Sequence, residues 1–204
     1  MNKGFTLSKP SKMPCNSFSI PAIMCKTGSK LRKIEGSVCA KCYAHKGFYN
    51  MPNVRQALAA RLRELRDPQW VERMVAVIRA NESSGYFRWH DSGDLQGIWH
   101  LRNIVEVAKR MPDIRFWLPT KEERLVERYR KLHGKEPSNL TIRVSAHMVG
   151  EVCDAPVSSM VVKKGTTPLY NGVWTCPAKD QGNKCLTCRA CWDPKVRIVA
   201  YLEH

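Results

Sequence analysis

Acidic residues are scarce in this sequence. Its 204 residues include 18 Asp and Glu against 34 Lys and Arg, which gives a formal net charge of +16. Such an imbalance costs stability through self-repulsion and is typical of proteins with a polyanionic partner. Nucleic acid is the first candidate partner, and a membrane surface is less suitable because no basic amphipathic tail is present. A basic protein with a merely solvated surface is the remaining alternative.

Several targeting and binding signals are also missing. No apolar run approaches the length of a membrane span, and Met1-Asn-Lys-Gly lacks the apolar core of a signal peptide. We therefore expect a cytoplasmic protein without a membrane partner. The loops G-x-x-x-x-G-K-[ST] and G-x-G-x-x-G are absent, so a P-loop or dinucleotide-binding fold is unsupported. With no low-complexity tract, residues 1–204 are expected to form a single domain.

The nine cysteines of a chain in a reducing compartment favour metal binding over disulfides. Residues 176–192, here called the C-terminal cysteine loop, contain the spacing C-x8-C-x2-C-x2-C. Two-residue gaps let consecutive thiolates point at one centre, which is typical of a 4Fe–4S cluster. Zinc is the alternative metal, although it usually takes two separated C-x2-C pairs. The expected ligands are Cys176, Cys185, Cys188 and Cys191.

Residues 1–52 show little periodicity and many helix-breaking residues, so an irregular N-terminal segment is expected. This segment holds a second set of four cysteines with longer gaps, namely Cys15, Cys25, Cys39 and Cys42. The single C-x2-C pair is compatible with a second metal site. Buried structural thiols, or one cysteine lent to the main cluster, are the alternatives. Cys153 stands alone and is expected in the core.

The middle of the chain alternates between strand and helix patterns. Amphipathic or capped helices are expected over 53–66, 68–81, 97–110 and 121–133, the second opened by Asp67-Pro68 and the last closed by Gly134. Aromatic or β-branched strands are expected over 86–90, 114–118, 140–145, 158–163 and 196–202. Alternating strands and helices predict an α/β fold with a parallel sheet. Because the chain is short for eight units, we expect a partial or reduced TIM-like barrel that carries the C-terminal cysteine loop.

Three arginines recur at nearly equal intervals. Arg88, Arg115 and Arg143 are 27 and 28 residues apart, so we expect them at equivalent places on successive strands. Strand alternation puts them on one face with Trp117, opposite an apolar face that includes Phe87. Either carboxylates neutralise the arginines or they meet a phosphate backbone, with Trp117 available to stack on bases. Lys121 is a further candidate for phosphate contact.

Ligands of such folds bind at the carboxyl ends of the strands. The first of the aromatic strands ends in His90-Asp91-Ser92-Gly93-Asp94. His90, Asp91 and Asp94 are the candidate catalytic residues, either as general acid and base or as ligands of a divalent metal. An ordinary Asx-turn is the structural alternative for the same residues.

Six sequence motifs span nearly the whole chain: Lys12-Met-Pro-Cys15-x-Ser-Phe-Ser-Ile-Pro21, Cys39-x-x-Cys42-Tyr-Ala-x-Lys-Gly47, Phe87-Arg-Trp-His-Asp-Ser-Gly-Asp94, Phe116-Trp-Leu-Pro-Thr120, Ser138-Asn-Leu-Thr-Ile-Arg-Val-Ser145 and the C-terminal cysteine run. In these motifs the chain resembles the bacteriophage "gene product 88" family. The resemblance implies a viral source and a setting in the host cytoplasm. It implies no settled activity, so function is argued from the residues.

The leading hypothesis from these residues is an iron–sulfur nuclease that acts on single-stranded DNA or RNA. A non-catalytic nucleic-acid-binding protein with a structural or redox cluster is the first alternative. The βα repeats and cysteines also look like radical S-adenosylmethionine enzymes, which is the second alternative. Those enzymes carry C-x3-C-x2-C, which is absent here, and four nearby thiolates would leave no iron open. The sequence does not indicate an oligomeric state.

Overall fold

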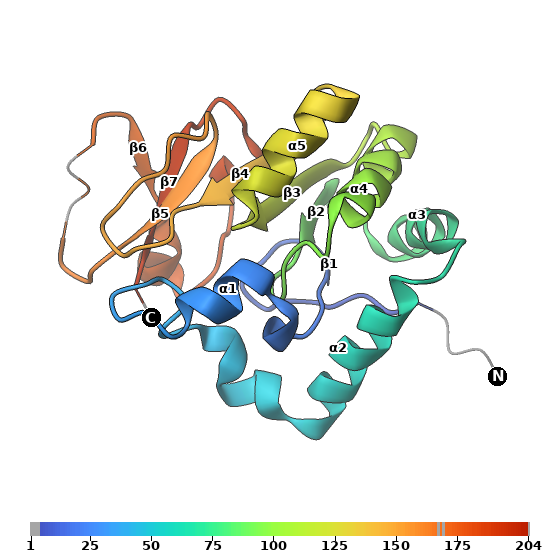
Figure 1. Cartoon of the computed structure of the whole chain (residues 1–204), viewed down its shortest axis with the longest axis horizontal. Helices are drawn as coiled ribbons and strands as arrows, with labels where there is room; N and C mark the ends of the chain where they lie inside the picture. Colours follow the sequence, from blue (N-terminus) through green and yellow to red (C-terminus); the bar gives the residue numbers. More distant parts are fainter. Residues whose placement is uncertain (1–4, 167, 169, 204) are drawn as a thin grey trace.

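The structure is a computed structural model that describes residues 5–166, 168 and 170–203. The segment Met1-Asn-Lys-Gly, which lacks the apolar core of a signal peptide, lies outside the described residues. One sheet and the helices beside it make up most of the regular structure (Figure 1). The strands are β1 (Ser17–Phe18), β2 (Tyr86–Trp89), β3 (Arg115–Thr120), β4 (Leu140–Ser145), β5 (Ser158–Val162), β6 (Val173–Thr175) and β7 (Ile198–Leu202). The α-helices are α1 (Lys26–Leu31), α2 (Pro52–Glu64), α3 (Trp70–Asn81), α4 (Ile98–Arg110) and α5 (Glu123–His133). Five short 3-10 helices complete the described elements: η1 (Ala22–Met24), η2 (Tyr43–His45), η3 (Gly47–Asn50), η4 (Pro177–Gln181) and η5 (Ala190–Trp192).

The seven strands form one parallel sheet in the order β1-β2-β3-β4-β5-β7-β6. The predicted α/β class and its parallel pairing are therefore confirmed. The reduced barrel is not confirmed, because β1 and β6 remain the two edges of an open sheet in the described chain. Strands β1 and β6 were not predicted from the sequence, since segments of two and three residues are too short for a periodic pattern.

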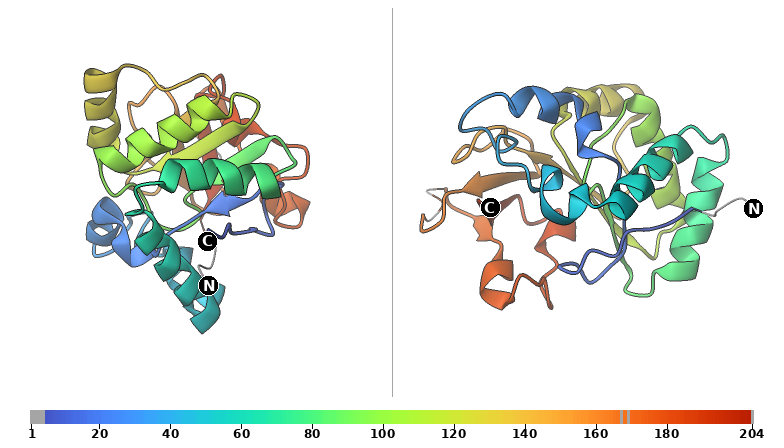
Figure 2. Two further views of the ribbon diagram at one scale, coloured as in Figure 1. Left: turned by 90° about the vertical axis from the view of Figure 1, so that its right-hand side faces the viewer. Right: turned by 90° about the horizontal axis from the view of Figure 1, so that it is seen from below.

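Helices α3, α4 and α5 cover one face of the sheet, as the turned views show (Figure 2). Their apolar sides pack on Phe87, Trp89, Phe116 and Leu118 of the strands, which are all fully buried. Burying each such side chain stabilises the fold by roughly 2–3 kcal/mol relative to leaving it exposed. The predicted apolar face and the helices above it are thus confirmed.

The start of α3 differs from the prediction. The helix begins at Trp70 rather than at Pro68, with Gln69 as its N-cap residue. The Asp67 carboxylate instead accepts a hydrogen bond from the backbone N–H of Gln69, at 2.8 Å, and forms a turn before the helix. The end of α5 is as expected, because Gly134 caps it with φ +79°.

The opposite face of the sheet is covered by irregular chain from both termini. Trp192 of the C-terminal cysteine loop packs against Trp117 of β3, with ring centroids 5.2 Å apart. Its indole N–H donates to the carbonyl of Phe87 at 2.9 Å, and its own carbonyl accepts from the Thr141 hydroxyl at 2.7 Å. The loop connects β6 to β7. Cys176, Cys188 and Cys191 of the loop belong to the same apolar cluster as Trp117, so they lie on this face of the sheet.

Candidate functional site

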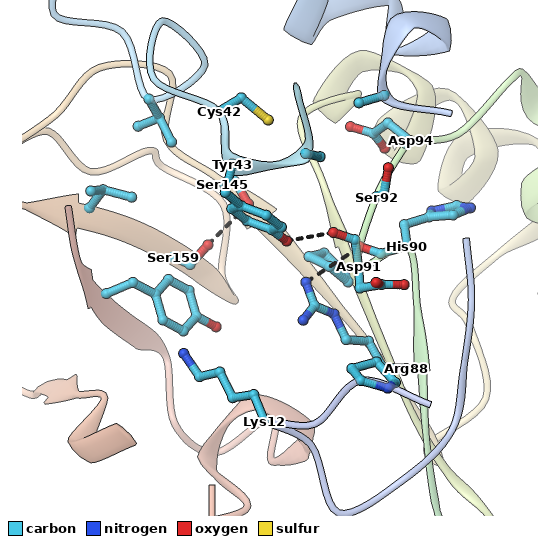
Figure 3. A pocket seen from close by; sticks show the side chains of 18 of the residues that line it. Lys12, Cys42, Tyr43, Arg88, His90, Asp91, Ser92, Asp94, Ser145 and Ser159 are labelled. Atoms are coloured by element: carbon cyan, nitrogen blue, oxygen red, sulfur yellow. Dashed lines mark hydrogen bonds between the residues drawn. The ribbon is translucent and has the colours of Figure 1, made fainter. Parts of the chain in front are cut away.

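A cavity of about 800 Å³ lies where the strands end, and Figure 3 shows part of its lining. Residues 90–94 after β2, 120–121 at the end of β3, and 145–146 at the end of β4 all contribute to it. The prediction that these three strand ends meet at one site is therefore confirmed. The charged side chains around the cavity are mostly basic: Lys9, Lys12, Lys41, Arg61, Arg88, Lys121 and Lys179, against the acidic Asp91, Asp94 and Glu203.

His90 ends β2 in an unusual backbone conformation, with φ +56°. Its backbone N–H donates to the carbonyl of Phe18 at 2.9 Å, so the residue still belongs to the sheet pairing. The residue is 3 % exposed and its ring lies edge-on to that of His100, and neither ring nitrogen has a hydrogen-bond partner among the described residues. Burial, and secondarily the charge of Arg88, lower the pKa of His90 to about 3, so the ring is neutral at physiological pH.

This buried imidazole makes a prediction for acid stability. Below pH 6.5 the unfolded chain protonates His90 while the folded chain does not until about pH 3. The free energy of unfolding should therefore fall as pH drops through this window, by up to ~1.4 kcal/mol per pH unit from this residue. Asn tolerates a positive φ, so His90→Asn should flatten the slope without new strain. Asp94 acts in the opposite sense but is the same in both proteins.

Urea denaturation at several pH values measures that slope. The matched control is His133→Asn, because His133 is exposed at the end of α5 and should leave the slope as it is. His100 is buried as well and its pKa is also lowered, so part of the acid sensitivity should persist in His90→Asn. Identical slopes for the wild type and His90→Asn would contradict the assignment of a neutral buried ring.

Asp91 is held in a hydrogen-bond network that joins three segments. Its carboxylate accepts from the Ser17 hydroxyl and from the Tyr49 phenol, both at 2.7 Å. Its backbone carbonyl accepts from the phenol of Tyr43, a contact visible in Figure 3. Both carboxylate oxygens are thus engaged, which indicates a residue that positions the two tyrosines at the cavity wall.

Asp94 is the buried carboxylate at this edge of the sheet. It accepts hydrogen bonds from the Thr120 hydroxyl at 2.6 Å, from the backbone N–H of Lys121 at 2.9 Å and from that of Leu95 at 2.7 Å. Burial raises the pKa of Asp94 to about 6, although these hydrogen bonds act in the opposite direction. A carboxyl group that titrates near neutral pH can both accept and donate a proton.

The three predicted catalytic residues line one cavity without converging. The structure gives each its own set of neighbours, with His90 beside His100, Asp91 on the tyrosines and Asp94 on Thr120. Across the described ranges, no group of three or more His, Cys, Asp and Glu side chains is placed to hold a metal ion. His90, Asp91 and Asp94 are therefore not arranged in this structure as the ligands of one divalent metal ion.

The three arginines share one sheet face but not one row. Tyr86 of β2 pairs with Arg115, Arg88 with Trp117, and Pro119 with Arg143, so their expected equivalence is wrong. Arg88 lines the cavity with its guanidinium 4.5 Å from the centre of the Trp117 ring. The Trp117 ring itself is 3 % exposed, which leaves no open face for stacking on a base.

Arg143 and Arg115 have different environments from the one expected. Arg143 is fully buried, and its two terminal nitrogens donate to backbone carbonyls, those of Ser158, Val196, Arg197, Ala190 and Asp193. It is therefore a structural residue and cannot contact a phosphate backbone in this fold. Arg115 is exposed at the opposite end of β3, away from the cavity. Lys121 does line the cavity, with its ammonium donating to the carbonyl of Ala146 at 2.7 Å.

The C-terminal cysteine loop supplies thiols to the other side of the cavity. Cys176, Cys185 and Cys191 line it, and Cys188 packs in the same apolar cluster as Cys176 and Cys191. Burial raises the pKa of Cys191 to about 12, while the hydrogen bond with Tyr201, at 3.1 Å, and the charge of Arg143 act against it. All nine cysteines are free thiols, and in the described ranges these four are not arranged to hold a single metal ion.

The structure brings three further residues close to the C-terminal cysteine loop. Cys15 packs with Cys191 and Trp117 rather than with the other N-terminal cysteines. Lys12 lies near these thiols, since the carbonyl of Lys12 accepts from the N–H of Cys185 at 2.9 Å. Tyr201 of β7 points to Cys191. Cys15 was named from the sequence among the N-terminal cysteines, and Lys12 only within a family motif. No local pattern in the sequence pointed to Tyr201.

Comparisons with known proteins identify the family but no activity. The family model described as "Gene product 88" matches residues 2–194, so the chain belongs to this family. No curated protein and no solved structure matches the chain. Within residues 5–166, 168 and 170–203, every helix is too short or too polar to cross a membrane.

Proposed function

We propose that this member of the Gene product 88 family is an iron–sulfur enzyme that cleaves single-stranded nucleic acid. A 4Fe–4S cluster would be held by Cys176, Cys185, Cys188 and Cys191 in this proposal. The observation that carries it is the shared cavity, because thiols of the C-terminal cysteine loop and the polar residues at the strand ends both line it. Thiols and a titratable carboxyl group around one cavity are typical of an active site rather than of a structural metal site alone.

The surroundings of the thiols support a cluster. A 4Fe–4S centre with four thiolates carries a charge of about −2, which must be compensated when it is buried. Burial raises the pKa of both Cys191 and Cys185. The positive charge of Arg143 acts against this rise at Cys191, and that of Lys12 acts against it at Cys185. A single zinc ion needs four ligands about 2.3 Å from one centre, and no such group is present in the described chain. A cubane is wider, since each thiolate binds a different iron, and it suits thiols that lie further apart.

Asp94 is the residue best placed for proton transfer. Its pKa of about 6 is near neutral pH, and its three hydrogen bonds fix its orientation at the cavity wall. His90 is neutral and buried, and in our proposal it shapes the end of β2 beside Asp94. Asp91 would act through Tyr43 and Tyr49, which it holds at the wall.

The charge pattern supports an anionic substrate. The net charge is +16, and seven basic side chains against three acidic ones line the cavity. A cavity of about 800 Å³ has room for a nucleotide unit of a single strand but not for a duplex. Arg88 and Lys121 are the candidate phosphate contacts, whereas Arg143 and Arg115 are not part of the site.

Cleavage of a labelled single-stranded oligonucleotide by anaerobically purified protein tests the proposal. Asp94→Asn should slow cleavage by at least ~100-fold, as expected for loss of a general acid or base. Asp113→Asn is the matched control, because Asp113 is exposed in the loop before β3 and should retain full activity. Equal rates for Asp94→Asn and the wild type, or no cleavage by protein with an intact cluster, would contradict a hydrolytic nuclease.

A redox enzyme is the second candidate function. The observation that favours it is a second group of thiols, Cys25, Cys39 and Cys42, which lines the same cavity. Two groups of sulfur ligands around one cavity suit electron transfer to a bound substrate better than hydrolysis. Reductive cleavage of S-adenosylmethionine by the reduced protein would favour this candidate, in line with the resemblance to radical enzymes.

A further inference from the structure

The four N-terminal cysteines do not form one set in the structure. Cys15 precedes β1 and joins the cluster of Cys191 and Trp117. Cys25, Cys39 and Cys42 all lie after β1, and the three together line the cavity. We call these three residues the N-terminal thiol triad. Figure 3 shows Cys42 at the end of the cavity where Asp94 lies, away from Lys12.

A glycine leaves space between two thiols of the triad. A Cβ atom on Gly28 would lie 3.5 Å from the sulfur of Cys39 and 3.7 Å from that of Cys25. It would also lie 3.0 Å from the Cβ atom of Cys25, which is tighter than ordinary contact. Glycine inside a helix costs about 1 kcal/mol relative to alanine, so its presence in α1 needs a compensating reason. The crowding of this position by Cys25 and Cys39 provides one. Like the C-terminal cysteines, the three thiols are not placed around a single metal ion within the described ranges.

The third thiol is held close by the local backbone. The N–H of Cys42 donates to the carbonyl of Cys39 at 3.2 Å, which closes a tight turn across the C-x2-C pair. Such a turn lets both sulfurs face the same side of the chain. Cys153 is not a fourth member, because its sulfur contacts the carbonyl of Val144 at 3.6 Å and does not line the cavity.

A half-buried cation lies near the triad. The Lys121 ammonium is fixed by the Ala146 carbonyl, and burial lowers its pKa while the charges of Cys39 and Asp94 oppose this. A lysine so placed compensates negative charge on nearby sulfurs. Asp94 and Lys121 therefore form the cavity wall beside the triad.

We propose that Cys25, Cys39 and Cys42 hold a second iron–sulfur cluster whose fourth iron is open to the cavity. Four thiolates close a cluster, whereas three leave one position for an exchangeable ligand, as in catalytic metal sites with three protein ligands. The open iron would take an anionic oxygen or an amine of a small molecule bound beside Lys121. The C-terminal cysteine loop would hold the closed cluster, so the two ends of the cavity differ in function.

Iron analysis of anaerobically purified and reconstituted protein tests this inference. The wild type should bind about eight irons per chain, and Cys42→Ser or the double variant Cys39→Ser/Cys42→Ser should retain about four. Cys153→Ser is the matched control and should keep the full content. Cys42 lies in a half-buried loop, so the single variant is expected to fold even if the double variant does not. Unchanged iron in Cys42→Ser, or zinc in place of iron, would overturn the inference.

Binding of a small anion tests the open position separately. Cyanide added to the reduced wild type should alter its electron paramagnetic resonance spectrum, and it should have no effect on Cys42→Ser. The double variant Cys188→Ser/Cys191→Ser lacks the proposed closed cluster and should still respond to cyanide. A response that depends on the C-terminal cysteines instead would place the open iron there and overturn the inference. Iron loss in this C-terminal variant tests the Proposed function independently of the triad.

Discussion

Gly93→Ala is expected to lower the free energy of unfolding by more than ~3 kcal/mol, because the turn after β2 has no room for a Cβ atom. That atom would lie 2.3 Å from Cγ1 of Ile20 and 2.7 Å from its carbonyl oxygen. Ile20 cannot move away easily, since its backbone exchanges hydrogen bonds with Ser92 at 3.1 and 3.0 Å. The φ of +83° at Gly93 adds the strain of a left-handed alanine.

Gly85→Ala separates the clash from the backbone strain. Gly85 has φ +76°, and nothing lies within 4 Å of the position of its Cβ atom. Its substitution should therefore cost only about 1–2 kcal/mol, the penalty of the left-handed conformation. Urea denaturation followed by circular dichroism measures both values. Similar losses for the two variants would show that the close approach of Ile20 to Gly93 does not constrain the turn.

The same turn shows what the sequence could predict. The strand pattern over 86–90 and the polar run after it placed His90, Asp91 and Asp94 at the carboxyl edge of a parallel sheet, and the structure confirms that placement. Such inferences succeed because side-chain alternation and βα order are local properties of the chain. Which of the three would titrate near neutral pH was not predictable, since this depends on burial and on partners such as Thr120.

Long-range packing decided the features that the sequence could not show. The spacing of the arginines was read as an equivalent place on each strand, yet the strand register shifts Arg115 and Arg143 into different rows. Spacing also grouped Cys15 with the triad, but Cys15 precedes β1 and packs with Cys191 and Trp117, whereas the triad follows β1 and lines the cavity. In both cases the residue type was informative, and its neighbours were set by elements distant in sequence.

The sheet therefore separates two kinds of residue that look alike in the sequence. Arg88 and Lys121 line the cavity beside the thiols, where their charges suit an anionic substrate or cluster. The guanidinium of Arg143 instead donates to backbone carbonyls, and none of these hydrogen bonds goes to a charged side chain. A buried guanidinium with many carbonyl acceptors is a means of ordering irregular chain, because each carbonyl needs a donor when it is removed from water.

Arg143→Met is expected to cause the largest loss of stability of any single substitution on the sheet face that the C-terminal cysteine loop covers. It would leave the carbonyls of Ala190, Asp193 and Val196 without this donor, and these carbonyls belong to the chain that carries Cys188 and Cys191. The Ala190 and Asp193 carbonyls also accept from the backbone N–H groups of Asp193 and Val196, so each keeps one hydrogen bond. Breaking a buried charged hydrogen-bond network by removing one partner costs about 3–5 kcal/mol, which is the loss expected in the free energy of unfolding.

Iron analysis of Arg143→Met should show which part of the structure is destabilised. If Arg143 orders the C-terminal cysteine loop, Arg143→Met should lose iron from this loop before the N-terminal thiol triad loses any, because the triad makes no contact with Arg143 in the hydrogen bonds described. Arg115→Met is the matched control, since Arg115 is exposed at the far end of β3 and should change neither stability nor iron. Equal effects of the two substitutions would contradict the structural role of Arg143 and restore a shared surface role for the arginines.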